Sequence, residues 1–189
     1  MTHEKFHIAL IGAGRAGMIH ARNFKTSVPY ACITAVCDPV GNAAAEAAKE
    51  LELDKAYTDY HDVMADDTID AVIIATPTKF HCEIAIAAAN AKKHILCEKP
   101  MAMTVEECDR MERAARDNGV KLQIAFMRRF DRSFAEAKRM IDAGSIGDVV
   151  MVRSNTRGPS IPKPWMYDIS KSNGPLAEVN SHDIDTLRW

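Results

Sequence analysis

The sequence lacks several features that would point to particular protein classes. Its 189 residues include five Cys, an odd number without a C-x-x-C pair, so neither a disulfide framework nor a zinc site is indicated. No apolar run approaches the roughly 18 residues of a membrane helix. The formal net charge is −2 and the basic residues are scattered, so we expect no nucleic-acid partner and no membrane contact. These absences favour a protein of the reducing cytoplasm.

Short apolar runs alternate with longer helix-forming stretches in the first two thirds of the chain. The runs are Phe6–Ile11, Ala31–Cys37, 71–75, His94–Cys97 and 121–126, and the helical stretches are 16–25, 42–51, 80–91 and 104–118. The run at 71–75 is apolar at every position, which is typical of a strand covered on both faces of a parallel sheet. The alternation predicts an α/β fold, a doubly wound parallel-sheet (Rossmann) domain over residues 1–126.

The pattern changes after residue 126. It predicts a helix from Asp131 to near Gly144, a strand at 147–154, a loop rich in Gly and Pro at 158–175, and a terminal helix. These elements are too few to enclose a core of their own. We therefore expect residues 127–189 to be the beginning of a second α/β domain.

A G-x-G-x-x-G motif lies between the first predicted strand and the first predicted helix. In this context Gly12 permits a tight turn, Gly14 lets a pyrophosphate approach the backbone, and Gly17 lets helix and strand pack closely. The helix N-terminus supplies N–H groups and a positive dipole end for the phosphates. The predicted cofactor-binding loop consists of Gly12, Ala13, Gly14, Arg15, Ala16 and Gly17.

Asp38 directly follows the second apolar run and lies 21 residues beyond Gly17. At this spacing an acidic side chain hydrogen-bonds the hydroxyls of the adenosine ribose. Its negative charge would repel a 2′-phosphate, so the sequence predicts NAD in preference to NADP.

Two further strand ends carry polar residues that should face the cofactor. Thr76 and Pro77 follow the run at 71–75, and Glu98 and Lys99 follow His94–Cys97. His81 could reach the same cleft or could equally cap or pack its own helix. Lys99 could stabilise a developing alkoxide or could be an exposed loop residue that pairs with Glu98.

The last predicted helix carries Glu178, His182 and Asp185, spaced by four and three residues. At about 100° per residue they would share an arc of roughly 60°, together with Trp189. A His between carboxylates suits a general acid or base. From spacing alone, however, a solvated face with salt bridges is the favoured interpretation.

Taken together, these motifs resemble the Gfo/Idh/MocA family of oxidoreductases, and most closely its inositol and polyol dehydrogenases. The resemblance runs from the first strand to Trp189 and is carried by several segments. They are Gly12–Gly17, Asp38, 75–77 with His81, 97–100, 126–131, 144–147, and the segment from Gly174 through His182 and Asp185 to Trp189. Glu-Lys-Pro followed by His-x-x-Asp is specific, whereas the glycine motif alone is not.

The resemblance implies an NAD(P)-dependent enzyme that oxidises a sugar or cyclitol hydroxyl by hydride transfer. It implies that Lys99 contacts the reacting hydroxyl, that His182 accepts the proton, and that Asp185 helps to hold the substrate. It also implies a frequently cis Lys99–Pro100 bond and a homo-oligomer, a dimer or tetramer. Glu178 departs from the pattern, because the acid four residues before the His is usually Asp.

Family members typically continue well beyond this point, so we expect a fragment of a longer protein with an incomplete substrate pocket. Two other functions stay open. One is NAD-dependent cleavage of glycosides through transient oxidation, and the other is a non-catalytic nucleotide-binding sensor on the same fold.

Overall fold

The computed structural model describes residues 5–156 and 164–189. They form two compact units, of which the first ends at Ile124 and the second runs from Ala125 to Trp189. Part of the predicted loop, residues 158–163, lies outside the described residues.

The first unit is built on one six-stranded sheet in which every neighbouring pair is parallel. Its strands are β1 (Phe6–Ile11), β2 (Ala31–Cys37), β3 (Lys55–Tyr57), β4 (Ala71–Ile74), β5 (His94–Cys97) and β6 (Leu122–Ile124). Their order is β3-β2-β1-β4-β5-β6, so the chain moves outward from β1 and then returns to start again at β4. The predicted doubly wound parallel sheet is confirmed. The reversal between β1 and β4 marks the crevice where such sheets bind ligands, beyond the carboxyl ends of the strands.

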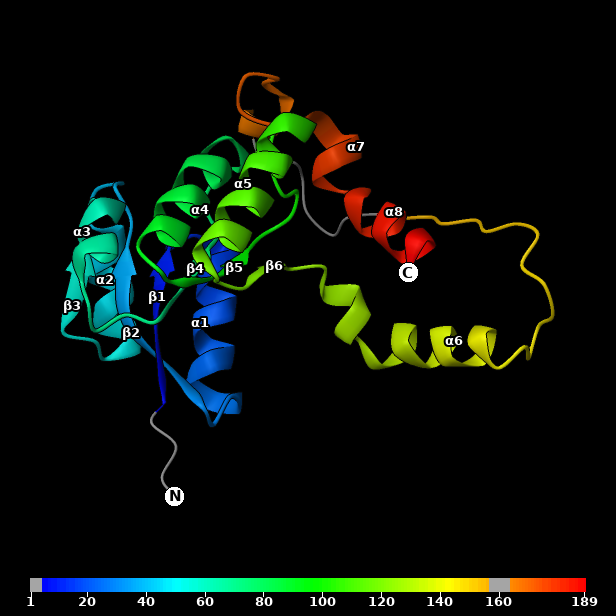
Figure 1. Cartoon of the computed structure of the whole chain (residues 1–189), viewed down its shortest axis with the longest axis horizontal. Coiled ribbons are helices and arrows are strands. Elements are labelled where there is room, and N and C mark those ends of the chain that lie inside the picture. Colours follow the sequence, from blue (N-terminus) through cyan, green and yellow to red (C-terminus); the bar gives the residue numbers. More distant parts are fainter. Residues whose placement is uncertain (1–4, 157–163) are drawn as a thin grey trace. The chain divides into compact units, whose positions relative to one another are not determined.

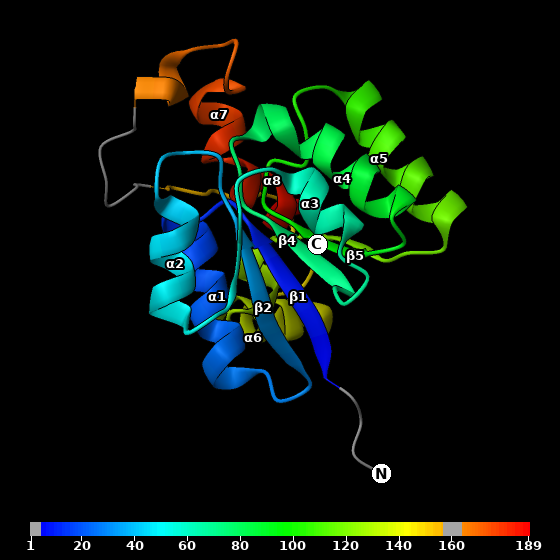
Figure 2. The ribbon, with the colours of Figure 1, turned by 90° about the vertical axis from the view of Figure 1, so that its left-hand side faces the viewer.

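Helices cover both faces of this sheet, with α1 and α2 on one side and α4 and α5 on the other (Figures 1 and 2). The helical segments are α1 (Arg15–Ser27), α2 (Ala43–Leu51), α3 (Tyr60–Ala65), the 3₁₀ turn η1 (Thr78–Phe80), α4 (His81–Asn90) and α5 (Val105–Asn118). Alternate residues of β1 supply the two cores: Ile8 and Leu10 pack with α1 and α2, while Ala9 and Ile11 pack with α3, α4 and α5. This double coverage explains why the strands are continuously apolar.

The last helix of this unit shows how local sequence sets its boundaries. Thr104 caps α5 by accepting the Glu107 N–H at 3.2 Å, and the Glu107 carboxylate accepts the Met103 N–H at 2.9 Å. Gly119 ends the helix with a positive φ of 70°, a conformation that favours glycine. The helical stretch predicted at 104–118 is confirmed, with Thr104 as the N-cap of α5.

The sequence patterns missed β3 and α3. The strand has three residues, and two of them, Lys55 and Tyr57, are polar at their tips, so no apolar run marks it. Its pairing with 35–37 of β2 is a tertiary effect that local propensity does not encode. The helix has only six residues, although Asp59 caps it through the His61 N–H.

The second unit consists of short helical segments. They are η2 (Met127–Phe130), α6 (Arg132–Asp142), η3 (Pro164–Tyr167), α7 (Gly174–Glu178) and α8 (Ser181–Arg188). The helix predicted from Asp131 is confirmed, with Asp131 as its N-cap. The loop predicted at 158–175 was wrong where η3 and the start of α7 lie.

The strand predicted at 147–154 was also wrong, since those residues adopt no strand. Val150 is 96% exposed and Met151 84% exposed. Among the described residues no strand pairs with this segment, and an unpaired segment cannot satisfy the hydrogen bonds that define a strand.

The single terminal helix was the third incorrect prediction. Helix α7 ends at Glu178, and α8 begins at Ser181 after Asn180. Glu178 therefore does not share a helical face with His182 and Asp185. Leu176 of α7 and Leu187 of α8 are 69% and 52% exposed, so neither leucine packs into a core.

Candidate active site

The glycine loop connects β1 to α1 at the switch point of the sheet. A Cβ on Gly12 would lie 2.6 Å from the Ala75 carbonyl oxygen, and one on Gly17 would lie 2.0 Å from the Gly12 carbonyl oxygen. Any side chain at either position would therefore force strand, loop and helix apart. Gly14 differs, because a Cβ there would meet nothing within 4 Å. The first and third glycines serve packing, and the second leaves open space over the backbone.

This open space suits the pyrophosphate of a dinucleotide. Gly14, Arg15 and Ala16 are exposed, and Gly14 begins α1 without a side-chain cap. The N–H groups of the first helical turn are thus free of a side-chain acceptor and point toward the open side of the loop. The backbone here fits a bound phosphate group.

Asp38 lies at the end of β2 and holds the loop in place. One carboxylate oxygen accepts the Ala13 N–H at 2.8 Å, and the other accepts the Val40 N–H at 2.9 Å. Each oxygen keeps a further lone pair that could accept a ribose hydroxyl. The side chain is only half-buried, so a ligand can reach it.

The end of β4 adds a polar atom to the same edge. Thr76 Oγ1 is buried and has no hydrogen-bond partner in the described part of the chain. Such a group is costly unless a ligand or water satisfies it. Pro77, the next residue, is exposed. The Thr76–Pro77 turn follows β4 after Ala75, beside the glycine loop that follows β1.

His81 packs inside the first unit and is only 1% exposed. Its Nδ1 lies 3.0 Å from the Pro100 carbonyl oxygen and its Nε2 lies 2.9 Å from the Thr76 carbonyl oxygen. Of the two roles left open for this residue, the structure supports the packing role. His81 joins the turn after β4 to the turn after β5 and reaches a cofactor only through that backbone.

The Glu-Lys-Pro segment follows β5. The Lys99–Pro100 bond is cis, as the resemblance implied. Glu98 is hydrogen-bonded to His20 of α1 at 2.7 Å and accepts the Lys99 N–H at 3.1 Å. Burial acts to raise the pKa of Glu98, but the bonds from His20 and Lys99 outweigh it and hold the pKa below its usual value. Glu98 therefore pairs with a histidine that the sequence patterns did not single out.

The other proposed catalytic residues lie in the second unit. Glu178 ends α7 and is buried, while His182 and Asp185 are half-buried on α8. Both carboxylate oxygens of Asp185 accept hydrogen bonds from the Arg129 guanidinium at 2.8 Å. This bidentate pair raises the pKa of Arg129.

Asp183 is a buried acidic residue of α8 that the sequence analysis did not single out. It is 5% exposed and accepts hydrogen bonds from Arg128, Ser154, Thr156 and Asn180. Burial acts to raise its pKa, but these donors and the Arg128 charge hold the pKa far below the usual value. The carboxylate anchors α8 to η2. The sequence signal for this contact was the pair of arginines in Met127-Arg-Arg-Phe. Arg128 pairs with Asp183 and Arg129 pairs with Asp185.

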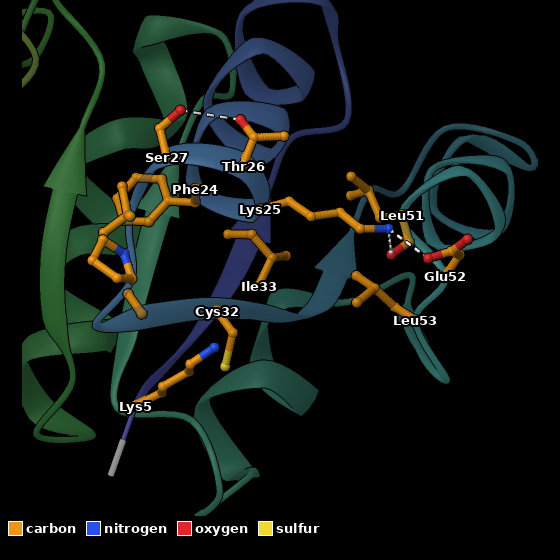
Figure 3. Close-up of a pocket in the computed structure, with 13 residues that line it drawn as sticks. Lys5, Phe24, Lys25, Thr26, Ser27, Cys32, Ile33, Leu51, Glu52 and Leu53 are labelled. Atoms are coloured by element: carbon orange, nitrogen blue, oxygen red, sulfur yellow. Dashed lines mark hydrogen bonds and ion pairs between the residues drawn. The ribbon is translucent and has the colours of Figure 1, made fainter. Parts of the chain in front are cut away.

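Two cavities differ in their relation to these residues. One of about 410 Å³ lies near the amino ends of β1 and β2, among Phe24, Lys25, Cys32 and Leu53 (Figure 3). None of the predicted site residues lines it, and it is at the wrong end of the strands for a doubly wound sheet. The other, about 510 Å³, lies in the second unit and is lined by Arg129, Asp185 and seven further residues.

Within 5–156 and 164–189, no helix has the length and apolarity that a membrane span requires. The same residues contain no grouping of His, Cys, Asp and Glu suited to a metal ion.

The curated relatives include dehydrogenases that match the whole chain. It is 40% identical over 189 residues to scyllo-inositol 2-dehydrogenase (NAD(+)) of Bacillus subtilis, covering 100% of this chain and 54% of that protein. It is 37% identical to myo-inositol 2-dehydrogenase of Thermotoga maritima, covering 96% and 54%. The chain therefore spans about half the length of these relatives.

Solved structures give the same picture. Apo scyllo-inositol dehydrogenase from Lactobacillus casei superposes with a TM-score of 0.89 at 34% identity, covering 100% of this chain and 55% of that one. A structure of scyllo-inositol dehydrogenase from the same organism with bound NAD(H) and scyllo-inositol gives 0.87 at 34% identity, covering 98% and 56%.

Family models account for nearly all of the sequence. Residues 6–126 match the oxidoreductase family with an NAD-binding Rossmann fold, and residues 134–189 match the GFO/IDH/MocA C-terminal domain. With the glycine loop, Asp38 and the Glu-Lys-Pro turn at one edge of the sheet, the chain belongs to the Gfo/Idh/MocA family of oxidoreductases.

Proposed function

We propose that this chain carries the cofactor site and catalytic residues of an NAD-dependent dehydrogenase that oxidises a secondary hydroxyl of a cyclitol or sugar. The observation that carries the proposal is the carboxyl edge of the sheet. There the open glycine loop, Asp38, the unsatisfied Thr76 hydroxyl and the Glu-Lys-Pro turn follow four neighbouring strands.

The residues at this edge fit a dinucleotide. The loop of residues 12–17 would hold the pyrophosphate, Asp38 the adenosine ribose, and the turns at Thr76 and Glu98 the nicotinamide half. When bound, NAD accepts the hydride that leaves the substrate carbon. Asp38 supports NAD over NADP, because its charge disfavours a 2′-phosphate.

The remaining chemistry belongs to side chains. Lys99 would donate a hydrogen bond to the substrate oxygen and stabilise its developing negative charge. His182 would take the hydroxyl proton on a ring nitrogen as the carbon loses its hydride, which leaves a ketone. Glu178 would act on His182 or on a substrate hydroxyl, since it is the acid that the resemblance places four residues before the His.

Asp185 has a more specific proposed role than the resemblance alone suggests. Both its oxygens are already bonded to Arg129, whose side chain is 38% exposed. We infer that Asp185 and Arg129 act as one preorganised pair, in which the aspartate orients the guanidinium beside the cavity of about 510 Å³.

The cyclitol class is supported by the relatives. Two that match nearly the whole chain are inositol dehydrogenases, and one related structure contains NAD(H) together with scyllo-inositol. We propose inositols as the first substrates to test, with aldoses second.

The test uses the full-length protein with NAD and a panel of inositols and aldoses, and follows NADH absorbance. We expect turnover with at least one inositol, and His182→Ala should lower kcat by at least ~100-fold, the usual contribution of a general base. NAD titration of the variant should show unchanged binding. Intact turnover in His182→Ala would contradict the assignment of the base.

The same assay separates the two other functions. Hydrolysis of an aryl glycoside without net NADH formation would identify a glycoside-cleaving enzyme. Tight NAD binding without activity on any polyol or glycoside would identify a sensor.

A further inference from the structure

The Glu98 carboxylate connects two elements of the first unit. Oε1 lies 2.7 Å from Nε2 of His20 on α1, and Oε2 accepts the backbone N–H of Lys99 at 3.1 Å. The helix that begins at the glycine loop is thus linked through the Glu98 carboxylate to the backbone of Lys99, the proposed catalytic lysine.

The chemistry of this link fixes the direction of its hydrogen bonds. An ionised carboxylate only accepts, so His20 donates through Nε2. The side chains of His20 and Glu98 are 24% and 20% exposed, which limits competition from water. The lowered pKa of Glu98 keeps it ionised at neutral pH. Charge-assisted bonds of this kind are about twice as strong as neutral ones.

The glycine motif explains why His20 can reach Glu98. Gly17 has no room for a side chain, since its Cβ would lie 2.0 Å from the Gly12 carbonyl oxygen, so α1 packs directly against the loop. His20 is three residues later and therefore lies on the same face of the helix, one turn further on. The close approach that Gly17 permits places the imidazole over the end of β5.

We propose that His20 is a positioning residue for Lys99. It holds the Glu98 carboxylate against the Lys99 amide and so fixes the backbone that presents the lysine to the substrate hydroxyl. This inference rests on the proposed function for the role of Lys99, but the hydrogen-bonded link itself can be measured independently. It also means that the helix proposed to bind the pyrophosphate and the turn that carries Lys99 form one preorganised assembly.

The experiment compares three variants of the full-length protein. His20→Ala removes the donor, and His20→Gln keeps an N–H donor at similar reach. His61→Gln is the matched control, because His61 also pairs with a carboxylate, that of Asp59, at 2.7 Å but on the surface. We expect His20→Ala to lower kcat by roughly 10- to 100-fold, with a much smaller change in NAD affinity. His20→Gln should recover most of the loss, and His61→Gln should match wild type.

A second readout does not depend on activity. Hydrogen exchange of the Lys99 amide, followed by NMR, should be at least ~10-fold faster in His20→Ala than in wild type, and near wild type in His20→Gln and His61→Gln. If His20→Ala does not fold, Glu98→Gln tests the same link, since it keeps an acceptor but loses the charge. Faster Lys99 exchange is expected there too.

The outcomes separate the two proposals. Unchanged Lys99 protection in His20→Ala, or equal losses of kcat in His20→Ala and His20→Gln, would overturn the positioning role. Full turnover in Lys99→Ala would instead overturn the proposed function of the lysine, while the exchange measurement would still decide whether His20 holds the turn.

Discussion

Asp38 combines a structural and a proposed binding role in one side chain. Its carboxylate accepts the N–H groups of Ala13 and Val40, so it already fixes the glycine loop before any ligand binds. A preorganised acceptor of this kind loses little conformational freedom on binding a ribose. The residue that we propose to discriminate between NAD and NADP is therefore also one that shapes the glycine loop.

Asp38→Ser should change the cofactor preference of the full-length protein. The loss of a charged hydrogen-bond partner, about 1.5–3 kcal/mol, should weaken NAD binding roughly 10- to 100-fold. Removal of the negative charge should at the same time improve NADP binding. Dissociation constants for both cofactors, measured by calorimetry, check this prediction.

The control for that variant is Asp70→Ser. Asp70 also accepts a backbone N–H, that of His7 at 2.8 Å, but it lies just before β4, at the other end of the strands. NAD affinity should not change in this control. A parallel loss of NAD and NADP affinity in Asp38→Ser would show that the residue acts only by shaping the loop.

At the scale of elements, α8 is held by carboxylates rather than by an apolar face. Asp183 is buried under Arg128, Ser154, Thr156 and Asn180, whereas Ile184 and Leu187 are about half exposed. A short helix with so little apolar burial depends on specific polar contacts for its position. Because His182 precedes Asp183, these contacts also set where the proposed base lies.

Asp183→Asn should destabilise the second unit and alter its response to acid. The native pKa of Asp183 lies below its unfolded value of 3.8, so its contribution is complete above about pH 4 and is lost as the pH falls further. We expect a loss on the order of 2 kcal/mol at pH 7 and a flatter pH dependence below pH 4.

Urea unfolding followed by Trp fluorescence measures this effect, since both tryptophans, Trp165 and Trp189, belong to the second unit. Asp142→Asn is the control, because its pair with Lys138 is exposed and should contribute less than ~1 kcal/mol. Equal effects of the two variants would refute the anchoring role of Asp183.

The sequence predicted those elements that carry their own local signals. Strands β1 and β2 had long apolar runs, and α5 had a cap at Thr104 and a stop at Gly119. The strand β3 lacked such a signal, because its pairing with β2 determines it, and no local signal marked the break after Glu178. The pairing of His20 with Glu98 spans 78 residues, and no local spacing rule could have identified it.

At the scale of the whole molecule, the sequence and the structure disagree most over residues 147–154. The segment has the apolar, β-branched composition of a strand, yet its side chains are exposed. Strand propensity mostly measures how well a residue fits a pleated, half-buried surface, so it has no effect where no neighbouring strand exists. The relatives are about twice as long as this chain, and in a protein of that length such a neighbour could be present.

Val150→Ser tests whether the segment is a strand that needs a partner. Val150 is 96% exposed, so in the 189-residue chain the substitution should change the free energy of unfolding by less than ~0.5 kcal/mol. In a protein extended to the length of the relatives, the same substitution should cost about 1 kcal/mol, because Val150 should then pack within a sheet.

The control is Val105→Ser, at a 71% exposed position in the first turn of α5, which should be nearly neutral in both proteins. If Val150→Ser were equally neutral in both, the segment would be a true loop, and its apolar composition would need another explanation, such as contact with a second molecule.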